Sequence, residues 1–415
     1  MHRPNTRKVI LLGALLLAAG TFLWSWSFYG RNLQGLRTAL APPREDIVKI
    51  IARNESPLVI PEGFSLNVFA QGLVNPRVIV KDPNGVLFVS VPATGQVLAL
   101  PDKDGDGRAD ATAVVVRGLN RPHGLAFRCV EGRCRLYVAE TNALRVYDYD
   151  ATALTASRPV KLADLPGGGN HFTRSLLFLP PPNDDQLLVA IGSTCNVCRE
   201  ADARRAKIMV INAGGGELRE YARGLRNSVF QAVHPLTGEV WATEMGRDLL
   251  GDDTPPDEIN IIADGKNYGW PICYGRNIHD TAFDKNTYIR NPCQEPFETP
   301  SHIDIPAHSA PLGLAFVTGS GWPTDYENGL FVAFHGSWNR STPTGYKVVR
   351  YRLGPGGEYL GVEDFITGWL RPDGNALGRP AGLLAEAGGT LFVADDKAGV
   401  IYRVTAPRLA GGGSR

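Results

Sequence analysis

The residues of this chain best suited to catalysis are one histidine and a set of arginines. His171 lies in Asn170–Arg174, directly after three consecutive glycines. Because the unperturbed pKa of histidine is near neutrality, His171 could act as a general base, although a histidine that is only hydrogen-bonded is the commoner case. Arginines that converge on one point repel one another unless they bind a polyanion, and a tryptophan could stack on such a ligand. The residues in this set are Arg226, Asn227, Arg247, His335, Trp338, Arg340 and Arg379.

An Asp-rich loop at residues 102–110 has the spacing of a calcium-binding loop. Its carboxylates stand two residues apart, a glycine at the sixth position allows a sharp turn, and the seventh position would supply a backbone carbonyl. Ala113 stands at the twelfth position, where a bidentate Glu is usual. The alternative interpretation is a solvated Asp-Gly turn. The predicted ligands are Asp102, Asp104, Asp106, Arg108 through its carbonyl, and Asp110.

A second acidic cluster occupies residues 248–258. Acidic side chains this close together repel one another unless they are solvated or bound to a cation. A solvated loop and a second calcium site are therefore both open interpretations. The members of the cluster are Asp248, Asp252, Asp253, Asp257 and Glu258.

The composition predicts a globular protein built from short strands. The chain has 415 residues and a net charge of +1, from 43 basic and 42 acidic residues. This balance argues against a nucleic-acid-binding protein that relies on a basic surface, and an apolar content of 43% excludes global disorder. With 47 glycines and 30 prolines, the sequence favours strands joined by tight turns over a helical bundle. No glycine motif of a dinucleotide-binding βαβ unit is present.

A two-strand pattern recurs six times after residue 60. In each repeat a turn precedes a short apolar strand, and a polar turn leads to a second apolar strand. Such repeats, with no composition break between them, predict a single all-β domain, a six-bladed β-propeller over residues 59–407, rather than a stack of sandwiches. The loops of all blades converge at the axis, so polar residues at blade entrances are the candidates for a site. The first strands begin near Arg77, Gly124, Ser175, Ser228, Gly313 and Gly382.

Residues 1–30 predict a membrane anchor or an export signal. Val9–Gly30 contains no ionisable side chain of Asp, Glu, Lys, Arg or His and is long enough to cross a bilayer as a helix. Ala39-Leu40-Ala41 has the small-x-small pattern of a signal-peptide cleavage site, but it lies far beyond the apolar stretch. The sequence therefore favours an uncleaved transmembrane anchor. Residues 31–58 are then a linker, and residues 408–415 a flexible tail.

The six cysteines fall into three local pairs, Cys129/Cys134, Cys195/Cys198 and Cys273/Cys293. Local pairs of this kind predict disulfides in an oxidising compartment, in agreement with an exported body. Zinc ligation would need paired cysteines at finger spacing or added histidines, which the sequence lacks. Attachment of c-type haem would need a histidine at position 199, where an arginine stands.

Several phrases of the sequence, taken together, resemble a known family. They are similar to the PQQ-dependent sugar dehydrogenases of the soluble glucose dehydrogenase and L-sorbosone dehydrogenase type, over about residues 60–405. The phrases are Asn120–Phe127, Asn170–Leu176, Gly192–Cys198, Arg223–Asn227, Glu244–Asp248, Pro256–Asn260, Asn267–Pro271, Phe334–Arg340 and Gly378–Pro380.

The resemblance implies a six-bladed propeller with PQQ and Ca²⁺ at its axis. His171 matches the general base that takes the hydroxyl proton while hydride moves from the sugar carbon to the quinone. Arg226 and Asn227 match a pair that contacts the cofactor, with Arg226 near the quinone oxygens. The backbone carbonyls of Gly246 and Arg247 match the ligands of the catalytic Ca²⁺.

The resemblance also implies further cofactor contacts and one departure. Arg379 matches an arginine that binds a PQQ carboxylate. Asn170 and Ser193 stand where glucose dehydrogenases have acidic residues beside the base, which puts glucose in doubt as the substrate. The segment expected to line the other side of the cofactor contains His335, Trp338 and Arg340.

These features predict a periplasm-facing, membrane-anchored PQQ dehydrogenase that oxidises a sugar and passes electrons to a quinone or cytochrome. Two alternatives stay open. A calcium-dependent sugar lactonase on the same fold would need side-chain carboxylates around one axial ion. A non-catalytic binding propeller would have no use for the histidine and arginines at the blade entrances. The sugar, the electron acceptor and the oligomeric state are not specified by the sequence.

Overall fold

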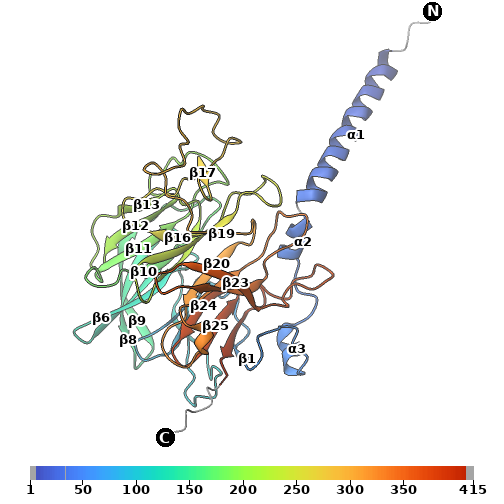
Figure 1. The fold of residues 1–415 in the computed structure, drawn as a ribbon. Helices are drawn as coiled ribbons and strands as arrows, with labels where there is room; N and C mark the ends of the chain where they lie inside the picture. Colours follow the sequence, from blue (N-terminus) through green and yellow to red (C-terminus); the bar gives the residue numbers. More distant parts are fainter. Residues whose placement is uncertain (1–5, 33, 408–415) are drawn as a thin grey trace, which may run out of the picture.

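The protein is an all-β propeller, as the computed structural model shows (Figure 1). The structure describes residues 6–32 and 34–407. These residues form six four-stranded antiparallel sheets, which we number as blades 1–6, and one two-stranded hairpin. The six-bladed propeller predicted from the repeats is therefore confirmed.

The blades follow one another along the chain, with one exception at the closure. Blade 1 contains β2 (Ile79–Lys81), β3 (Leu87–Val91), β4 (Gln96–Leu100) and β5 (Ala113–Val116). Blade 2 contains β6 (Leu125–Val130), β7 (Arg133–Ala139), β8 (Ala143–Asp150) and β9 (Thr155–Asp164). Blade 3 contains β10 (Leu176–Phe178), β11 (Gln186–Ile191), β12 (Lys207–Asn212) and β13 (Arg219–Arg223).

The second half of the propeller carries the insertions. Blade 4 contains β14 (Ser228–Val233), β15 (Val240–Glu244), β16 (Asp257–Ile262) and β19 (Ile303–Ile305), with the hairpin of β17 (Cys273–Tyr274) and β18 (Ile278–His279) inserted. Blade 5 contains β20 (Pro311–Phe316), β21 (Leu330–Phe334), β22 (Lys347–Leu353) and β23 (Tyr359–Ile366), with a short 3-10 helix at Thr324–Tyr326. Blade 6 contains β24 (Pro380–Glu386), β25 (Thr390–Asp395), β26 (Val400–Thr405) and β1 (Ser65–Ala70).

Burial against neighbouring blades explains the apolar composition of the inner strands. All residues of β3, β15, β21 and β25 are buried, because these strands have a blade on each face. Outer strands are freer, and most residues of β9 are exposed. Large side chains such as Phe88, Trp241 and Phe331 fill the space between blades without exposure to solvent. Each contributes about 1.5–3 kcal/mol by burial, so the packing between blades holds the ring together.

The ring is closed by the strand nearest the N-terminus of the propeller. β1 pairs antiparallel with β26, so blade 6 is built from both ends of the domain. The first strand of each blade contacts the first strands of its neighbours, including β2 against β24 across the closure. These six strands surround an apolar cavity of about 450 Å³ along the axis. The polar end of the axis is formed by the loops that lead into them.

The N-terminal segment differs from the expectation. α1 (Thr6–Asn32) projects away from the propeller (Figure 1). No helix among the described residues is both long and apolar enough to cross a membrane, so the predicted transmembrane anchor is not supported. The expected linker 31–58 contains two short helices, α2 (Gln34–Leu40) and α3 (Ile47–Ala52). The predicted tail 408–415 lies outside the described residues.

The three predicted disulfides are confirmed. Cys129 pairs with Cys134 across β6 and β7, Cys195 with Cys198 in a loop of blade 3, and Cys273 with Cys293 beside the β17–β18 hairpin. None of the six cysteines is free.

Candidate active site

A polar cavity of about 430 Å³, the axial cavity, lies at the end of the axis where the first strands of the blades begin. Loops that lead into β10, β14, β20 and β24 meet there with the loops that follow β15 and β21. The predicted residues that the cavity brings together are His171, Arg226, Asn227, Gly246, His335, Trp338 and Arg379. The remaining lining residues are Asn170, Met245, Asp248, Asp257, His308, Ala310, Gly336, Ser337 and Asn339.

His171 is held in one orientation and one tautomer. Its Nδ1 lies 2.9 Å from the carbonyl oxygen of Ser193 and 3.0 Å from Ser193 Oγ. Because a carbonyl oxygen only accepts, Nδ1 carries the proton. Ser193 Oγ donates to the carbonyl of Cys195 at 2.7 Å, which leaves its lone pairs for the imidazole. Nε2 is therefore unprotonated, and no group among the described residues hydrogen-bonds to it.

Two buried arginines place positive charge behind His171. Arg174 and Arg205 both donate to the carbonyl of Pro166, at 2.6 and 2.8 Å, and neither forms an ion pair within the described part of the chain. They thereby fix the glycine-rich loop that leads to His171. Burial, together with the charges of Arg226, Arg174 and Arg205, lowers the pKa of His171 to about 3. The imidazole is therefore a neutral hydrogen-bond acceptor at physiological pH.

Arg226 is fixed by contacts on two sides. Its Nε donates to the Asn196 carbonyl at 2.8 Å, and its Nη2 donates to Asn196 Oδ1 and Asp248 Oδ2, both at 2.9 Å. The Asp248 amide donates to the same Asn196 Oδ1 at 2.7 Å. Only 5% of the Arg226 side chain is exposed, so its charge acts in a medium of low polarity.

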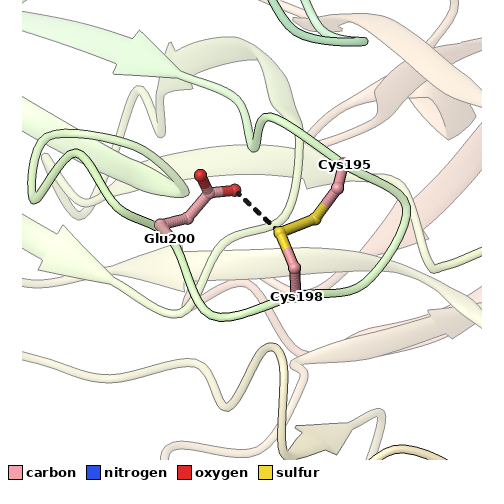
Figure 2. Close-up of side chains that lie close together, drawn as sticks. All are labelled: Cys195, Cys198 and Glu200. Atoms are coloured by element: carbon pink, nitrogen blue, oxygen red, sulfur yellow. Dashed lines mark hydrogen bonds between the residues drawn. A yellow bond between two sulfur atoms is a disulfide. The ribbon is translucent and has the colours of Figure 1, made fainter.

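The loop that carries Asn196 is closed by the Cys195–Cys198 disulfide (Figure 2). Glu200 lies beside it, with Oε1 at 3.9 Å from Cys198 Sγ and at 2.7 Å from the Thr194 amide, which donates to it. The two sulfurs are bonded to each other, so they are not thiolate ligands for a metal. Instead, the disulfide restrains the loop that holds Arg226.

Asn227 and His171 pack against a glycine. A Cβ at position 192 would lie 2.6 Å from Asn227 Oδ1 and 2.7 Å from His171 Cβ, both closer than van der Waals contact allows. The backbone amide of Asn227 donates to Glu244 Oε1 at 2.8 Å. A glycine at position 192 is therefore required for the His171 side chain and the side-chain amide of Asn227 to lie side by side.

Blades 5 and 6 supply the opposite wall of the axial cavity. Arg379 donates from Nε to the His335 carbonyl at 2.9 Å and from Nη2 to the Gly336 carbonyl at 2.6 Å. Burial and the charge of Arg379 lower the pKa of His335 to about 4, and its Nε2 lies 2.9 Å from Asp396. Asn339 is buried, and neither its side-chain nitrogen nor its oxygen has a hydrogen-bond partner. An orphaned amide that lines a cavity indicates a polar ligand.

The predicted calcium ligands Gly246 and Arg247 lie in the loop that follows β15, where Gly246 lines the axial cavity and Arg247 does not. The Gly246 amide donates to Asp257 Oδ1 at 2.9 Å, and the Arg247 side chain turns away to pair with Asp280 at 2.7 Å. Among the described residues, no hydrogen bond is made to the carbonyl of either Gly246 or Arg247. Burial raises the pKa of Asp257 to about 7. Two backbone carbonyls without hydrogen-bond partners fit a hard cation.

Arg340 and the acidic cluster are not arranged as a cofactor contact and a metal site. Arg340 does not line the axial cavity, because it donates to the Asp252 carbonyl and pairs with Asp253 at 2.9 Å. Asp248 pairs with Arg226, and Glu258 accepts from Asn260 and from a backbone amide. Within the ranges that the structure describes, these acids do not gather into a metal-type group. Arginines and hydrogen-bond donors, most of them from other segments of the chain, bind these acids instead.

The Asp-rich loop of blade 1 does gather its first three carboxylates. Asp102, Asp104 and Asp106 place one oxygen each within 4.8 Å of one another. Asp102 Oδ1 is buried without a hydrogen-bond partner. Asp110 instead accepts from the Lys103 amide at 2.6 Å and braces the loop. The Arg108 amide donates to Asp106 Oδ1 at 2.7 Å, a local turn that both a calcium loop and a solvated Asp-Gly turn would contain.

Several residues of the site were not predicted from the sequence. Asn196 and Asn339 lie within the family-like phrases, but nothing in their type distinguished them from turn residues. Arg205 lies outside those phrases, and only its contacts with the carbonyls of 166–168 reveal its role. His123, which lies in the family-like phrase Asn120–Phe127, is fully buried beside Arg174 and does not line the axial cavity.

The fold and the site together define a six-bladed propeller whose axial cavity combines a tautomer-locked histidine with guanidinium groups. The TrAA12-like family profile matches residues 58–407, so the chain belongs to this family.

Similar proteins with assigned activities are sugar oxidoreductases. The PQQ-dependent sugar dehydrogenase of Hypocrea jecorina is 25% identical, over 83% of this chain and 88% of that protein. The PQQ-dependent pyranose dehydrogenase of Coprinopsis cinerea is 24% identical over 83% of this chain, which spans about half (54%) of that longer protein. The solved structure of a Trichoderma reesei member of Carbohydrate-Active Enzymes Family AA12 superposes with a TM-score of 0.71 at 25% identity, covering 84% and 97% of the two chains.

Proposed function

We propose that this protein is a PQQ- and calcium-dependent sugar dehydrogenase with its active site in the axial cavity. The observation that carries the proposal is His171, whose unprotonated Nε2 has no partner in a cavity that also contains Arg226 and Arg379. The names of the family relatives from Hypocrea and Coprinopsis support the same chemistry.

The donors of the axial cavity fit a tricarboxylated quinone. Arg379 and the orphaned amide of Asn339 would bind carboxylate or carbonyl oxygens on one side. Asn227 and Arg226 would bind on the other side, and Trp338 offers a flat surface for stacking. The free carbonyls of Gly246 and Arg247 would hold Ca²⁺ next to the quinone.

The protein's own groups then account for proton transfer and charge stabilisation. PQQ, when bound, supplies a quinone that accepts hydride from the carbon bearing the sugar hydroxyl. His171 takes the hydroxyl proton at Nε2, while its Nδ1–H stays bonded to Ser193. Arg226, fixed by Asn196 and Asp248, stabilises the negative charge that develops on the acceptor. Sugar oxidation at the anomeric carbon gives a lactone, and the two electrons leave to an external quinone or cytochrome.

The proposal includes a structural calcium in the Asp102–Asp106 loop and an exported location. The unpartnered Asp102 Oδ1 supports the former, and the disulfides support the latter. The lactonase alternative is not favoured, because the carboxylates that line the axial cavity are already bound to protein donors: Asp248 to Arg226, and Asp257 to the amides of Gly246 and Ala310.

The test is reconstitution. Metal-free protein is titrated with PQQ, with and without Ca²⁺, by absorbance and calorimetry, and the loaded protein is then screened for sugar-dependent dye reduction. We expect saturable PQQ binding that is tighter with Ca²⁺, and reduction of dye by at least one aldose or ketose. If neither an absorbance change nor heat of binding is observed, the proposed function is wrong.

A further inference from the structure

A second cavity, of about 590 Å³, adjoins the axial cavity. The two share His335 and Arg379 in their walls, so they lie side by side. We call the second one the cationic cavity. Its other lining residues are Ala39, Asn75, Arg77, Pro92, Ala93, Arg121, Phe172, Asp396 and Lys397.

Positive charge exceeds negative charge in the cationic cavity. Its walls hold the basic side chains Arg77, Arg121, Arg379 and Lys397 but only one acid, Asp396. Arg77 pairs with Asp396 at 2.5 Å, and its buried Nε has no partner. The one carboxylate is therefore already used, by Arg77 and by His335. The other cations in this wall have no acid to neutralise them inside the cavity.

Arg121 is the most available of these cations. Its guanidinium carbon lies 3.6 Å from the centroid of the Phe172 ring, so the group is held flat by stacking. It is exposed and forms no ion pair with any described residue. Its backbone has a φ of +50°, a left-handed conformation that costs free energy for an arginine. The guanidinium is thus oriented by stacking and open to solvent, so it is available to a planar oxyanion.

The N-terminal segment completes this wall. Lys397 Nζ donates to the carbonyl of Thr38 at 2.7 Å, near the end of α2, and Ala39 lines the cavity beside it. The Thr38 hydroxyl donates to the Gly374 carbonyl at 2.7 Å, in the loop that leads into blade 6. Residues 34–40 lie outside the part of the chain that the TrAA12-like family matches. The contribution of residues 34–40 to this wall therefore lies outside the matched domain, whereas its basic side chains lie within it.

We propose that the cationic cavity binds an oxyanion on the substrate, so that the enzyme prefers acidic sugars over neutral ones. The inference rests on the proposed function, because it needs the reacting carbon of the same sugar to lie in the axial cavity near His171. The observation that carries the inference is the excess of basic over acidic side chains in the cationic cavity. The carboxylate of a uronic acid and the phosphate of a sugar phosphate share the chemistry that would pair with it.

The experiment separates binding from turnover. On PQQ- and Ca²⁺-loaded protein, calorimetry compares methyl glucuronide with methyl glucoside, neither of which has a free anomeric hydroxyl. Dye reduction then compares kcat/KM for glucuronate, glucose 6-phosphate and glucose. We expect methyl glucuronide to bind about tenfold or more tightly than methyl glucoside, since hydrogen bonds to charged groups are worth about one factor of ten or more. The better of the two anionic substrates identifies the oxyanion.

Arg121→Gln provides the decisive variant, and Arg117→Gln is its control. Arg117 is an exposed arginine outside both cavities. We expect Arg121→Gln to remove the preference for methyl glucuronide, about tenfold, with methyl glucoside and PQQ affinities unchanged, and Arg117→Gln to change none of them. Equal binding of the two glycosides by the unmodified protein overturns the inference, as does loss of PQQ affinity in Arg121→Gln. Failure of PQQ to bind the unmodified protein instead overturns the proposed function.

Discussion

Ser193→Ala tests how His171 is oriented. The substitution removes the Oγ that lies 3.0 Å from Nδ1 but leaves the backbone carbonyl at 2.9 Å, which alone fixes the tautomer. A net hydrogen bond is worth about 0.5–1.5 kcal/mol, so kcat should fall only about 2- to 10-fold. His171→Ala removes the base itself and should lower kcat by about 10²–10⁴. Ser193→Ala is therefore expected to lower kcat much less than His171→Ala does, because the backbone carbonyl of residue 193 still orients the imidazole.

The assay is dye reduction by PQQ-loaded protein between pH 5 and 9, with PQQ affinity measured in parallel as a control for folding. Both variants should bind PQQ with nearly unchanged affinity, since neither side chain is assigned to the cofactor. If Ser193→Ala is as damaging as His171→Ala, the carbonyl does not orient the base. If His171→Ala retains full kcat, another group takes the proton and the assignment fails.

Further predictions concern the cofactor, the metal and the pH dependence of stability. Arg379→Ala should weaken PQQ binding by about tenfold or more in a calorimetric titration, while kcat at saturating PQQ changes less; unchanged PQQ affinity would remove Arg379 from the cofactor site. Chelation should abolish dye reduction, and Ca²⁺ with PQQ should restore it, whereas Mg²⁺ should not if the carbonyls of Gly246 and Arg247 select the larger ion. Burial raises the pKa of Glu298 to about 7, so the ionised carboxylate lowers the free energy of unfolding most above pH 7. This destabilisation disappears as the pH falls toward 4, where the group is protonated in both the folded and the unfolded state. Glu298→Gln should therefore raise the free energy of unfolding at pH 8 by up to about 2 kcal/mol and have little effect at pH 4, as measured by chemical denaturation.

The sequence predicted the blades because their pattern is local. The first strand expected near Arg77 is β2 (Ile79–Lys81), and the second apolar strand of that repeat is β3 (Leu87–Val91). The closure by β1 was not predicted, since its partner β26 lies more than 300 residues away and no local pattern marks a pairing at that distance. The outer strand β9 is largely exposed and charged, so it lacks the apolar signal on which prediction depends.

The candidate site could be predicted as a set of residue types but not as a set of partners. His171, Arg226 and Arg379 were expected at one axis, and the axial cavity brings them together. Arg340 was expected to join them, but it pairs with Asp253 and does not line the axial cavity. Such choices depend on how loops from different blades meet, and these contacts are made across about 90 residues of sequence or more. Charge repulsion within 248–258 is likewise relieved by groups that the local sequence does not contain.

The electrostatics of the axial cavity connect the base to the cofactor. Burial and three neighbouring guanidinium groups keep His171 neutral but also make it a weak base in the ligand-free protein. An anionic ligand that pairs with Arg226 would offset one of these charges and favour the protonated imidazole, whereas the water it displaces would add to the burial that lowers the pKa of His171. The arginines that would bind PQQ therefore also act on the base. A propeller that only binds partners would gain nothing from a histidine held with Nε2 free beside those charges.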